Sequence, residues 1–277
     1  MKEGTINANG TTVHYIQEGE GPDIVWVPAG DQACDVYAEQ FAAFRDRFRC
    51  TSFDPRGAGK TVTPDPQPWQ IADFAADCAE LIRQVCDPPV VLTGLSLGAL
   101  ITQEVALSHH ELLRVAIPMG TIARKTGFAL EWEKAEIDMA AKGITMPADF
   151  SVIHYAVLSY PAEVLGDDDL WQTCRPNVAS AYGDRDPSLL AAQWQACMEY
   201  DSLDRLPGCQ VPMHVISFDQ DLQTPPSRGW VVAEAAANGH FHLLEGMGHF
   251  SVFGHKPEAV TRCIDDILSG YDLVGRK

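Results

Sequence analysis

One short stretch of the chain places a serine between two glycines, Gly94-Leu95-Ser96-Leu97-Gly98, in a G-x-S-x-G pattern. An apolar run from Pro89 to Leu92 leads into it, and an apolar helical stretch from Ala99 leads out. At so sharp a turn from strand to helix, a side chain at either glycine would clash, and the serine takes a strained backbone conformation. The turn lifts the hydroxyl above the sheet edge and aims the Leu97 amide at any oxyanion formed there. The pattern in this setting predicts that Ser96 is a catalytic nucleophile.

At this motif the sequence resembles the α/β-hydrolase superfamily, and the resemblance covers about Thr11 to Leu268. That family orders its triad as nucleophile, acid and histidine, so it implies two partners downstream of Ser96. The histidine is expected after the last strand, where LLEGMGHF places His249 behind a glycine-rich turn. The nearby alternatives lie at the start of that strand or beyond the turn: His240, His242 and His255.

The family's acid is expected after the preceding strand, in VPMHVISFDQDLQTPP, which offers Asp219 and Asp221. Hydrolases of this type often carry the acid three residues before a Thr-Pro or Val-Pro that starts the next helix. Asp221 has this spacing to Thr224-Pro225, so it is favoured, while Asp219 is left as a turn or loop-capping residue. Some relatives carry the acid after the strand that ends here at Met119. In this chain Gly120-Thr121-Ile122 follow, which argues against that arrangement.

The resemblance implies acyl-serine chemistry. His249 accepts the Ser96 proton during attack and returns it to the leaving group, because a serine hydroxyl is a poor nucleophile on its own. Asp221 fixes the imidazole tautomer and stabilises its charged form. Water then repeats the sequence on the acyl-enzyme.

The second oxyanion donor is expected in the loop after the strand DIVWVPAG. Many relatives have His-Gly there, whereas this chain reads Ala29-Gly30-Asp31. A backbone amide donates whatever its side chain, so the candidates are the amides of Gly30 or Asp31, paired with that of Leu97. The Asp31 carboxylate either turns away to hold the loop or contacts a polar part of the substrate. Val-Pro-x-Gly at this position is also similar to fungal zearalenone lactonases, although the favoured acid differs from theirs.

The stretch FDPRGAGKT, residues 53–61, looks like the end of a nucleotide-binding P-loop. A P-loop needs a glycine five residues before the Gly of Gly-Lys, and Asp54 occupies that position. The stretch is instead similar to the hydrolase family's D-x-R-G-x-G loop. We interpret it as a structural turn near the active site, with Lys60 solvated, and not as a nucleotide site.

Strand-like and helix-like segments alternate along most of the chain, the signature of a mostly parallel sheet covered on both faces. TTVHYIQEG alternates apolar and polar residues, as an antiparallel edge strand does. The later predicted strands are DIVWVPAG, CTSFD, PVVLTGL, LLRVAIPM, VPMHVISF and HFHLLEG. Helical spacing is found near residues 37–48, 71–85, 99–107, 230–237 and 257–268. The expected class is α/β: an α/β-hydrolase fold with a helical lid insertion.

The alternation stops within residues 122–200, which hold helical stretches rich in Trp, Tyr and Met and no convincing buried strand. We expect one hydrolase core, residues 1–121 and 201–277, with 122–200 as its lid, rather than an independent second domain. The lid aromatics favour a medium-sized apolar or aromatic substrate, although each could merely pack the lid. The pocket candidates are Trp132, Tyr155, Trp171 and Trp194. Single basic side chains that could serve there are Arg124, Lys125 and Arg175.

The composition of the chain limits the classes of molecule that it is expected to bind. The chain has 277 residues, 46% of them hydrophobic, and a formal charge of −18, which disfavours nucleic acid and anionic membranes. The N-terminus lacks an apolar signal region, and no run approaches the roughly 18 apolar residues of a membrane span. Eight scattered cysteines without metal-ligand spacing predict reduced, mostly buried thiols in a cytoplasmic protein, with no structural zinc.

Together these features predict a carboxylic ester or lactone hydrolase acting on a small molecule, with no sign of a metal or organic cofactor. LTGLSLGALI and DPRGAGKT are also similar to bacterial enol-lactonases and secondary-metabolite esterases, which makes lactone opening a serious subclass. Carbon–carbon bond hydrolysis or a cofactor-free reaction on the same triad is an alternative. So is a ligand receptor that keeps the triad and turns over slowly. Dehalogenases and epoxide hydrolases need an aspartate where Ser96 stands.

Overall fold

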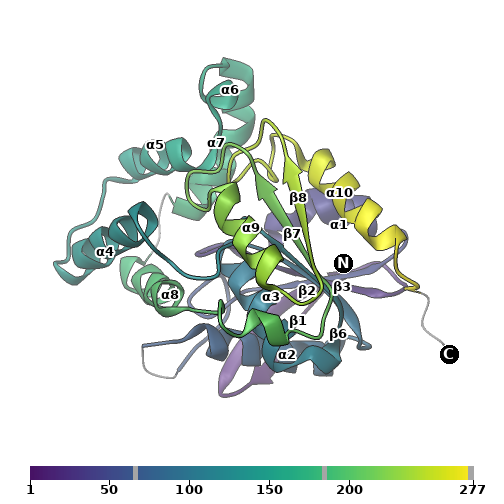
Figure 1. Ribbon diagram of the computed structural model, residues 1–277. Coiled ribbons are helices and arrows are strands. Elements are labelled where there is room, and N and C mark those ends of the chain that lie inside the picture. The colour runs from purple at the N-terminus through teal and green to yellow at the C-terminus, as the bar shows by residue number, and fades with distance from the viewer. Residues whose placement is uncertain (65–67, 183–185, 274–277) are drawn as a thin grey trace.

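The central sheet is antiparallel at one end and parallel over the rest (Figure 1). The structure is a computed structural model that describes residues 1–64, 68–182 and 186–273. Among these, eight strands lie in the order β1-β2-β4-β3-β5-β6-β7-β8. The β1–β2 and β2–β4 pairs are antiparallel and the remaining pairs are parallel. The strands are β1 Lys2–Ala8, β2 Thr11–Glu18, β3 Asp23–Val27, β4 Arg49–Phe53, β5 Val90–Leu95, β6 Leu113–Met119, β7 Met213–Phe218 and β8 Gly239–Leu244.

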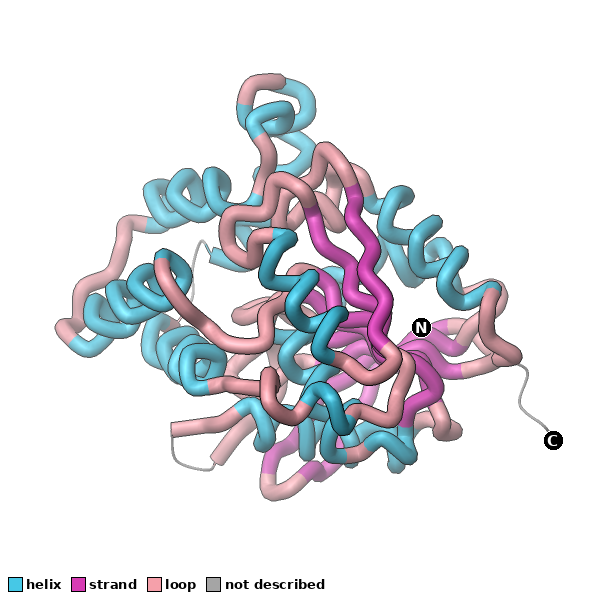
Figure 2. Tube along the Cα trace, viewed as in Figure 1, coloured by secondary structure: helices cyan, strands magenta, loops and turns pink. Residues whose placement is uncertain are grey.

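Helices cover both faces of the sheet, as the alternation of elements predicts (Figure 2). α2, α3 and α9 share one buried apolar cluster with the strands, and α1 and α10 share a second cluster. The strands at the centre of the sheet are therefore buried on both sides, which is why they read as continuous apolar runs. The helices of these layers are α1 Ala38–Phe44, α2 Ile71–Val85, α3 Leu97–Ser108, α9 Pro226–Ala235 and α10 Pro257–Ser269. The described part of the chain also contains three short 3-10 helices: η1 Cys34–Tyr37, η2 His110–Leu112 and η3 Leu206–Gly208.

The fold class is confirmed, but the edge position predicted for TTVHYIQEG is wrong. That segment is β2, and it lies between β1 and β4. The strand at the antiparallel edge is β1, which sequence reasoning missed. Only Ile6 and Ala8 of its seven residues are buried, so β1 carries too few apolar positions to show an alternating pattern.

Among the described residues between β6 and β7, five α-helices lie together on one side of the sheet (Figure 1). They are α4 Phe128–Ala141, α5 Ala148–Ser159, α6 Ala162–Leu165, α7 Asp168–Tyr182 and α8 Pro187–Glu199. No strand occurs among the described residues of 122–200, as expected from the sequence. Arg124 makes only an isolated β-bridge with Asp201.

The FDPRGAGKT stretch forms a turn built around the Asp54 carboxylate. Its Oδ2 accepts the Lys60 amide hydrogen at 2.7 Å, and its Oδ1 accepts that of Cys34 at 2.7 Å. Gly59 has φ +53, and a Cβ there would overlap this carboxylate, so glycine is required. The Lys60 side chain is 70% exposed. These contacts support the interpretation of the stretch as a structural turn.

The eight cysteines are free thiols, and all but the partly exposed Cys263 are buried. Burial raises the pKa of the Cys50 and Cys86 thiols to about 12, so both are protonated at neutral pH and act as small apolar side chains. Among the described residues, none of the helices combines the length and the apolar content that crossing a membrane requires.

Candidate active site

Ser96 stands at the turn from β5 into α3, and its backbone is strained as the motif predicts. Its φ is +57°, in the left-handed region that residues other than glycine rarely adopt. A Cβ at Gly94 would overlap the carbonyl group of Gly98, and a Cβ at Gly98 would overlap that of Val27 in β3. The close crossing of α3 over the sheet therefore excludes side chains at both positions. Ser96 itself remains partly exposed within an otherwise buried segment.

His249 is fully buried and bonded to Asp221. Its Nδ1 lies 2.6 Å from Asp221 Oδ2. Asp221 follows β7 and His249 follows β8, so the parallel pairing of these strands brings the two loops together. Thr224 Oγ1 donates to the same oxygen at 2.7 Å, and the amides of Gln223 and Thr224 donate to Oδ1 at 2.8 Å. These bonds hold the carboxylate in one orientation against the imidazole.

The Asp221 carboxylate is ionised although it is buried. Burial by itself raises the pKa of this carboxyl, but the opposing effects of His249 and of the hydrogen bonds from His249 and Thr224 are stronger, and the pKa lies below its ordinary value. An ionised carboxylate at Nδ1 places the neutral ring's proton there and leaves Nε2 as an acceptor. Within the described residues, Nε2 is buried and has no hydrogen-bond partner. One nitrogen of His249 is therefore available to take a proton.

The ring of His249 lies against the residue that follows β6, the strand beside Ser96. The Ser96 amide donates to the Met119 carbonyl at 3.1 Å. A Cβ on the next residue, Gly120, would lie 3.1 Å from His249 Cε1. The missing side chain at Gly120 thus leaves room for the imidazole near the serine turn. No hydrogen bond joins Ser96 Oγ to Nε2 among the described residues, and catalytic hydrogen bonds of this kind often form only when substrate binds.

The residues that the sequence offered in place of Asp221 and His249 have other partners. Asp219 is exposed and accepts the Met247 amide hydrogen at 3.0 Å, so it shapes the loop that carries His249. His255 Nδ1 lies 2.9 Å from Ser251 Oγ. His240 and His242 lie on β8, beside His214 of β7. The structure therefore brings Asp221 to His249 and leaves Asp219 in the turn.

The backbone amides of Leu97 and Gly30 have no hydrogen-bond partner among the described residues. Leu97 is the first residue of α3, where helical amides have no partner within the helix. Both residues line the same cavity as Ser96. The third candidate, the Asp31 amide, is occupied because it donates to Gln193 Oε1 at 2.8 Å. The expectation for the oxyanion hole therefore narrows to Leu97 and Gly30.

Ser96 lines a narrow cavity of about 30 Å³. Of the four aromatic pocket candidates, Trp132 and Trp194 line this cavity, with their ring centroids 4.8 Å apart. Tyr155 and Trp171 do not line it. Tyr155 is fully buried and stacks on Tyr182. Trp171 packs against the apolar cluster that α1 and α10 share. Both residues join the helices to one another.

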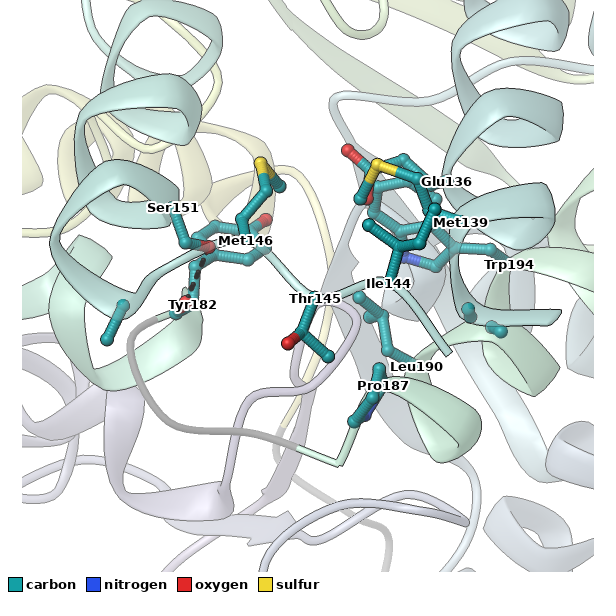
Figure 3. Close-up of a pocket in the computed structure, with 13 residues that line it drawn as sticks. Glu136, Met139, Ile144, Thr145, Met146, Ser151, Tyr182, Pro187, Leu190 and Trp194 are labelled. Atoms are coloured by element: carbon teal, nitrogen blue, oxygen red, sulfur yellow. Dashed lines mark hydrogen bonds between the residues drawn. The ribbon is translucent and has the colours of Figure 1, made fainter. Parts of the chain in front are cut away.

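A second pocket of about 250 Å³ lies among α4, α5, α7 and α8 (Figure 3). Met146 and Tyr182 lie on one side of it, and Met139 and Trp194 lie on the other. Tyr182 and Trp194 also line the Ser96 cavity, so these two side chains stand between the two spaces. The outer pocket gives the site apolar and aromatic surroundings.

Sequence reasoning missed Gln193 and Tyr182, which also line the Ser96 cavity. It named Lys125 only as one of three single basic residues and did not name its partner Glu133. Lys125 lines the cavity, whereas Arg124 pairs with Asp201 at 2.9 Å and Arg175 with Asp149 at 3.8 Å. None of these lining residues belongs to a motif. Their place in the site follows from how α4, α7 and α8 pack, which no local pattern reveals.

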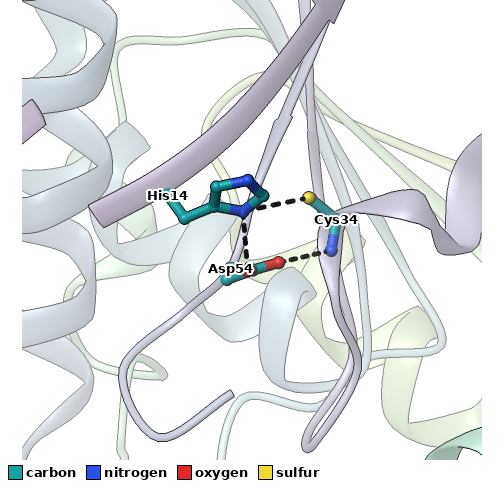
Figure 4. A group of neighbouring side chains, drawn as sticks. All are labelled: His14, Cys34 and Asp54. Carbon is teal, nitrogen blue, oxygen red and sulfur yellow. Dashed lines mark hydrogen bonds and ion pairs between the residues drawn. The ribbon is translucent and has the colours of Figure 1, made fainter. Parts of the chain in front are cut away.

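The structure also gathers His14, Cys34 and Asp54, whose potential ligand atoms lie within 4.8 Å of one another (Figure 4). Their spacing in sequence gave no sign of this group. His14 Nδ1 lies 2.8 Å from Asp54 Oδ2, and its Nε2 lies 2.8 Å from Glu3 Oε1. Burial, with Asp54 nearby, raises the pKa of the Cys34 thiol and disfavours the thiolate that metals bind. Existing hydrogen bonds thus occupy both imidazole nitrogens, and we assign the cluster a structural role.

Comparisons with known proteins show which family this chain belongs to. Residues 24–262 match the family model described as the alpha/beta hydrolase family. The curated protein "Putative non-heme bromoperoxidase BpoC" of Mycobacterium tuberculosis is 28% identical over 252 residues, which is 89% of this chain and 94% of that protein. The "3-oxoadipate enol-lactonase 2" of Acinetobacter baylyi is 23% identical over 93% of this chain and 96% of its own length.

The crystal structure of the Mycobacterium tuberculosis protein superposes with a TM-score of 0.85 at 26% identity, covering 93% of this chain and 96% of that one. The family model spans the segment from β3 to α10, including the serine turn and the loops of Asp221 and His249. This chain therefore belongs to the alpha/beta hydrolase family.

Proposed function

We propose that this chain is a serine hydrolase that cleaves a carboxylic ester or lactone through an acyl-serine intermediate. The observation that carries the proposal is the state of His249. Its Nδ1 is fixed by Asp221 at 2.6 Å, and its buried Nε2 has no partner within the described residues. Ser96, on a strained turn, lines the adjoining cavity together with two unpaired amides. A base, a nucleophile and oxyanion donors are what acyl transfer requires.

In the proposed reaction, the Ser96 hydroxyl attacks the substrate carbonyl while His249 Nε2 takes its proton. The negative charge develops on the carbonyl oxygen, where the Leu97 and Gly30 amides donate. When the carbonyl re-forms, the bond to the alcohol breaks, and Nε2 returns the proton to the departing oxygen. Water then attacks the acyl-serine in the same manner and releases the acid. A lactone gives a single hydroxy acid, because its alcohol and acyl parts remain joined.

We propose further that α4–α8 form a lid over the site, with residues 1–121 and 201–277 as the core. The cavity at Ser96 has a volume of about 30 Å³, close to the space for two waters at about 10–15 Å³ each. A medium-sized substrate therefore needs these helices to move. The walls of Trp132 and Trp194 favour an apolar or aromatic substrate. The enol-lactonase relative supports the inclusion of lactones.

The test is hydrolysis of p-nitrophenyl esters and medium-ring lactones by the wild type and Ser96→Ala. We expect turnover by the wild type and a loss of kcat of about 10⁴-fold or more in the variant. A fluorophosphonate should modify Ser96, as mapped by mass spectrometry. A folded wild-type protein that neither turns over any ester or lactone nor takes the label would contradict the proposal and favour a slow-turnover receptor.

A second candidate is peroxide-dependent bromination, which the name of the 28% identical relative suggests. Bromination of monochlorodimedone with hydrogen peroxide and bromide in acetate buffer measures this activity. If it exceeds ester hydrolysis in kcat/KM and is lost in Ser96→Ala, bromination becomes the main function. A carbon–carbon bond hydrolase would instead cleave diketone substrates faster than esters, so a diketone belongs in the same panel.

A further inference from the structure

The Ser96 cavity contains an ion pair that the proposed reaction does not use. Lys125 Nζ bonds to Glu133 Oε1, and both residues line the cavity. The two side chains are only 10% and 5% exposed. Lys125 precedes α4, and Glu133 lies in the second turn of that helix. Removing two charges from water costs several kcal/mol per ion, so stability alone gives little reason to place this pair in a cavity.

The pair leaves polar atoms unused. Glu133 Oε2 is buried and has no hydrogen-bond partner within the described residues. The same holds for the indole Nε1 of Trp132, which also lines the cavity. Lys125 Nζ carries three N–H groups, and Glu133 is its one partner in the described part of the chain. An unpaired buried group costs about 1–3 kcal/mol, so the cavity offers a ligand one acceptor and several donors.

These atoms suit a neutral group more than an anion. Glu133 already compensates the charge of Lys125. A carboxylate that bonded to Lys125 would meet the Glu133 carboxylate on the same nitrogen, and like charges repel strongly when they are buried. A hydroxyl or amide avoids this, since it donates to Oε2 and accepts from Lys125 or Trp132. A purely apolar group leaves all of these atoms unpaired.

Two other residues of the cavity wall are apolar and offer a polar substituent no hydrogen-bond partner. Leu100 and Ile122 also line the cavity and offer only apolar side chains. Burial raises the pKa of Glu133, although Lys125 opposes this, which agrees with a poorly solvated carboxyl group. A neutral polar substituent on a substrate therefore finds hydrogen-bond partners at the pair and not at these two apolar side chains.

We propose that Lys125, Glu133 and Trp132 form a polar subsite that selects esters or lactones bearing a hydroxyl or amide group away from the scissile carbonyl. The proposal rests on the proposed function, because it assigns the substrate class of the same cavity. The three side chains come from α4 and the segment before it, so this part of the chain sets specificity while the core supplies the chemistry.

The test uses ligands that differ at one substituent. In the first set the substituent is on the alcohol side of the ester. Its members are 3-hydroxyphenyl acetate, 3-methylphenyl acetate and 3-acetoxybenzoate, which carry a hydroxyl, a methyl and a carboxylate group. The other is p-nitrophenyl 6-hydroxyhexanoate, p-nitrophenyl heptanoate and mono-p-nitrophenyl adipate, which carries it on the acyl side. Binding to Ser96→Ala is measured by calorimetry, and kcat/KM is measured with the wild type. In one of the two sets, the hydroxyl compound should exceed its methyl analogue by about 10–100-fold in affinity and in kcat/KM.

Two changes examine the pair itself. The double variant Lys125→Met/Glu133→Leu replaces it with apolar side chains of similar size, and the ratio of hydroxyl to methyl compound should fall to about 1. Glu133→Gln leaves Lys125 uncompensated, so preference should move towards the carboxylate compound. Glu131→Gln and Lys134→Met change exposed residues of the same helix and serve as matched controls. Circular dichroism establishes that each variant is folded.

The subsite is refuted if hydroxyl and methyl compounds bind Ser96→Ala within about threefold in both sets. It is equally refuted if the double variant keeps the hydroxyl preference, or if the wild type binds the carboxylate compound most tightly. Selective binding by Ser96→Ala without turnover by the wild type would support the subsite and contradict the hydrolase proposal. Turnover that depends on Ser96 but shows no selectivity would support the hydrolase proposal and contradict the subsite.

Discussion

The side-chain carbonyl of Gln193 accepts the amide hydrogen of Asp31 at 2.8 Å, and so joins α8 to the loop beside Ser96. The other end of the same side chain donates to the Arg56 carbonyl at 2.6 Å. Gln193 is fully buried. One side chain from α8 therefore fixes two loops of the core and keeps the Asp31 amide from pointing freely into the cavity.

Gln193→Leu should weaken both stability and catalysis. The change leaves the Asp31 amide and the Arg56 carbonyl without this partner, which costs about 2–6 kcal/mol for two buried groups at about 1–3 kcal/mol each. The neighbouring Gly30 amide loses its fixed position, so kcat should fall more than KM rises. Urea unfolding and ester kinetics measure the two effects. Gln195→Leu, which alters a partly exposed residue on the same helix, is the control, and equal behaviour of the two variants would refute this role.

Asp221→Asn should lower kcat by about 10⁴-fold with little change in KM, because an amide at this position favours the wrong tautomer of His249. Asp219→Asn should lower kcat by less than about tenfold, since an amide oxygen can still accept from Met247. Steady-state kinetics with a p-nitrophenyl ester compare the two variants. A large loss in Asp219→Asn with an active Asp221→Asn would reverse the assignment.

Gly98→Ala should destabilise the protein by about 3 kcal/mol or more, because the added Cβ would overlap the carbonyls of Val27 and Pro28. Gly208→Ala is the matched control, since a Cβ there meets nothing within 4 Å. Its free energy of unfolding should change by less than about 1 kcal/mol. Urea unfolding of both variants decides the matter. If Gly98→Ala proves as stable as Gly208→Ala, the tight crossing of α3 over the sheet is wrong.

The free energy of unfolding should decrease as the pH is lowered, and His214 should account for part of this decrease. Burial, together with the neighbouring His240 and His242, lowers the pKa of this histidine from 6.5 to about 4. Between these two values the unfolded chain binds a proton at this residue and the folded chain does not, so the free energy of unfolding decreases as pH falls from 6.5 towards 4. Urea unfolding at pH 7 and pH 5 should show a smaller loss in His214→Gln than in the wild type.

His110→Gln removes an exposed histidine and is the control for this comparison. It should keep the wild-type dependence. The imidazole of His214 lies 2.7 Å from Tyr271 Oη. If His214→Gln keeps the wild-type pH dependence, this imidazole does not resist protonation in the folded state.

Much of the core was predictable because its signals are local. Ser96 lies between an apolar strand and an apolar helix. A Cβ at either flanking glycine would overlap neighbouring backbone atoms, which explains why both positions are glycine. The prediction of a helix over residues 71–85 is matched by α2, whose apolar face repeats regularly. The acid could be chosen because Asp221 has a fixed spacing to the proline that starts the next helix. β1 was missed since only two of its residues are buried.

The sequence by itself determined most of the alternation of strands and helices outside residues 122–200, the strained serine turn and the two loops that carry Asp221 and His249, because each depends on side chains close together along the chain. Only the tertiary structure decided that Gln193 occupies the Asp31 amide, that Tyr155 and Trp171 pack away from the cavity, and that Lys125 and Glu133 face it. Those facts depend on how the helices of 122–200 lie against the sheet. Packing between segments far apart in the chain follows from burial and shape, which no short pattern of residues encodes.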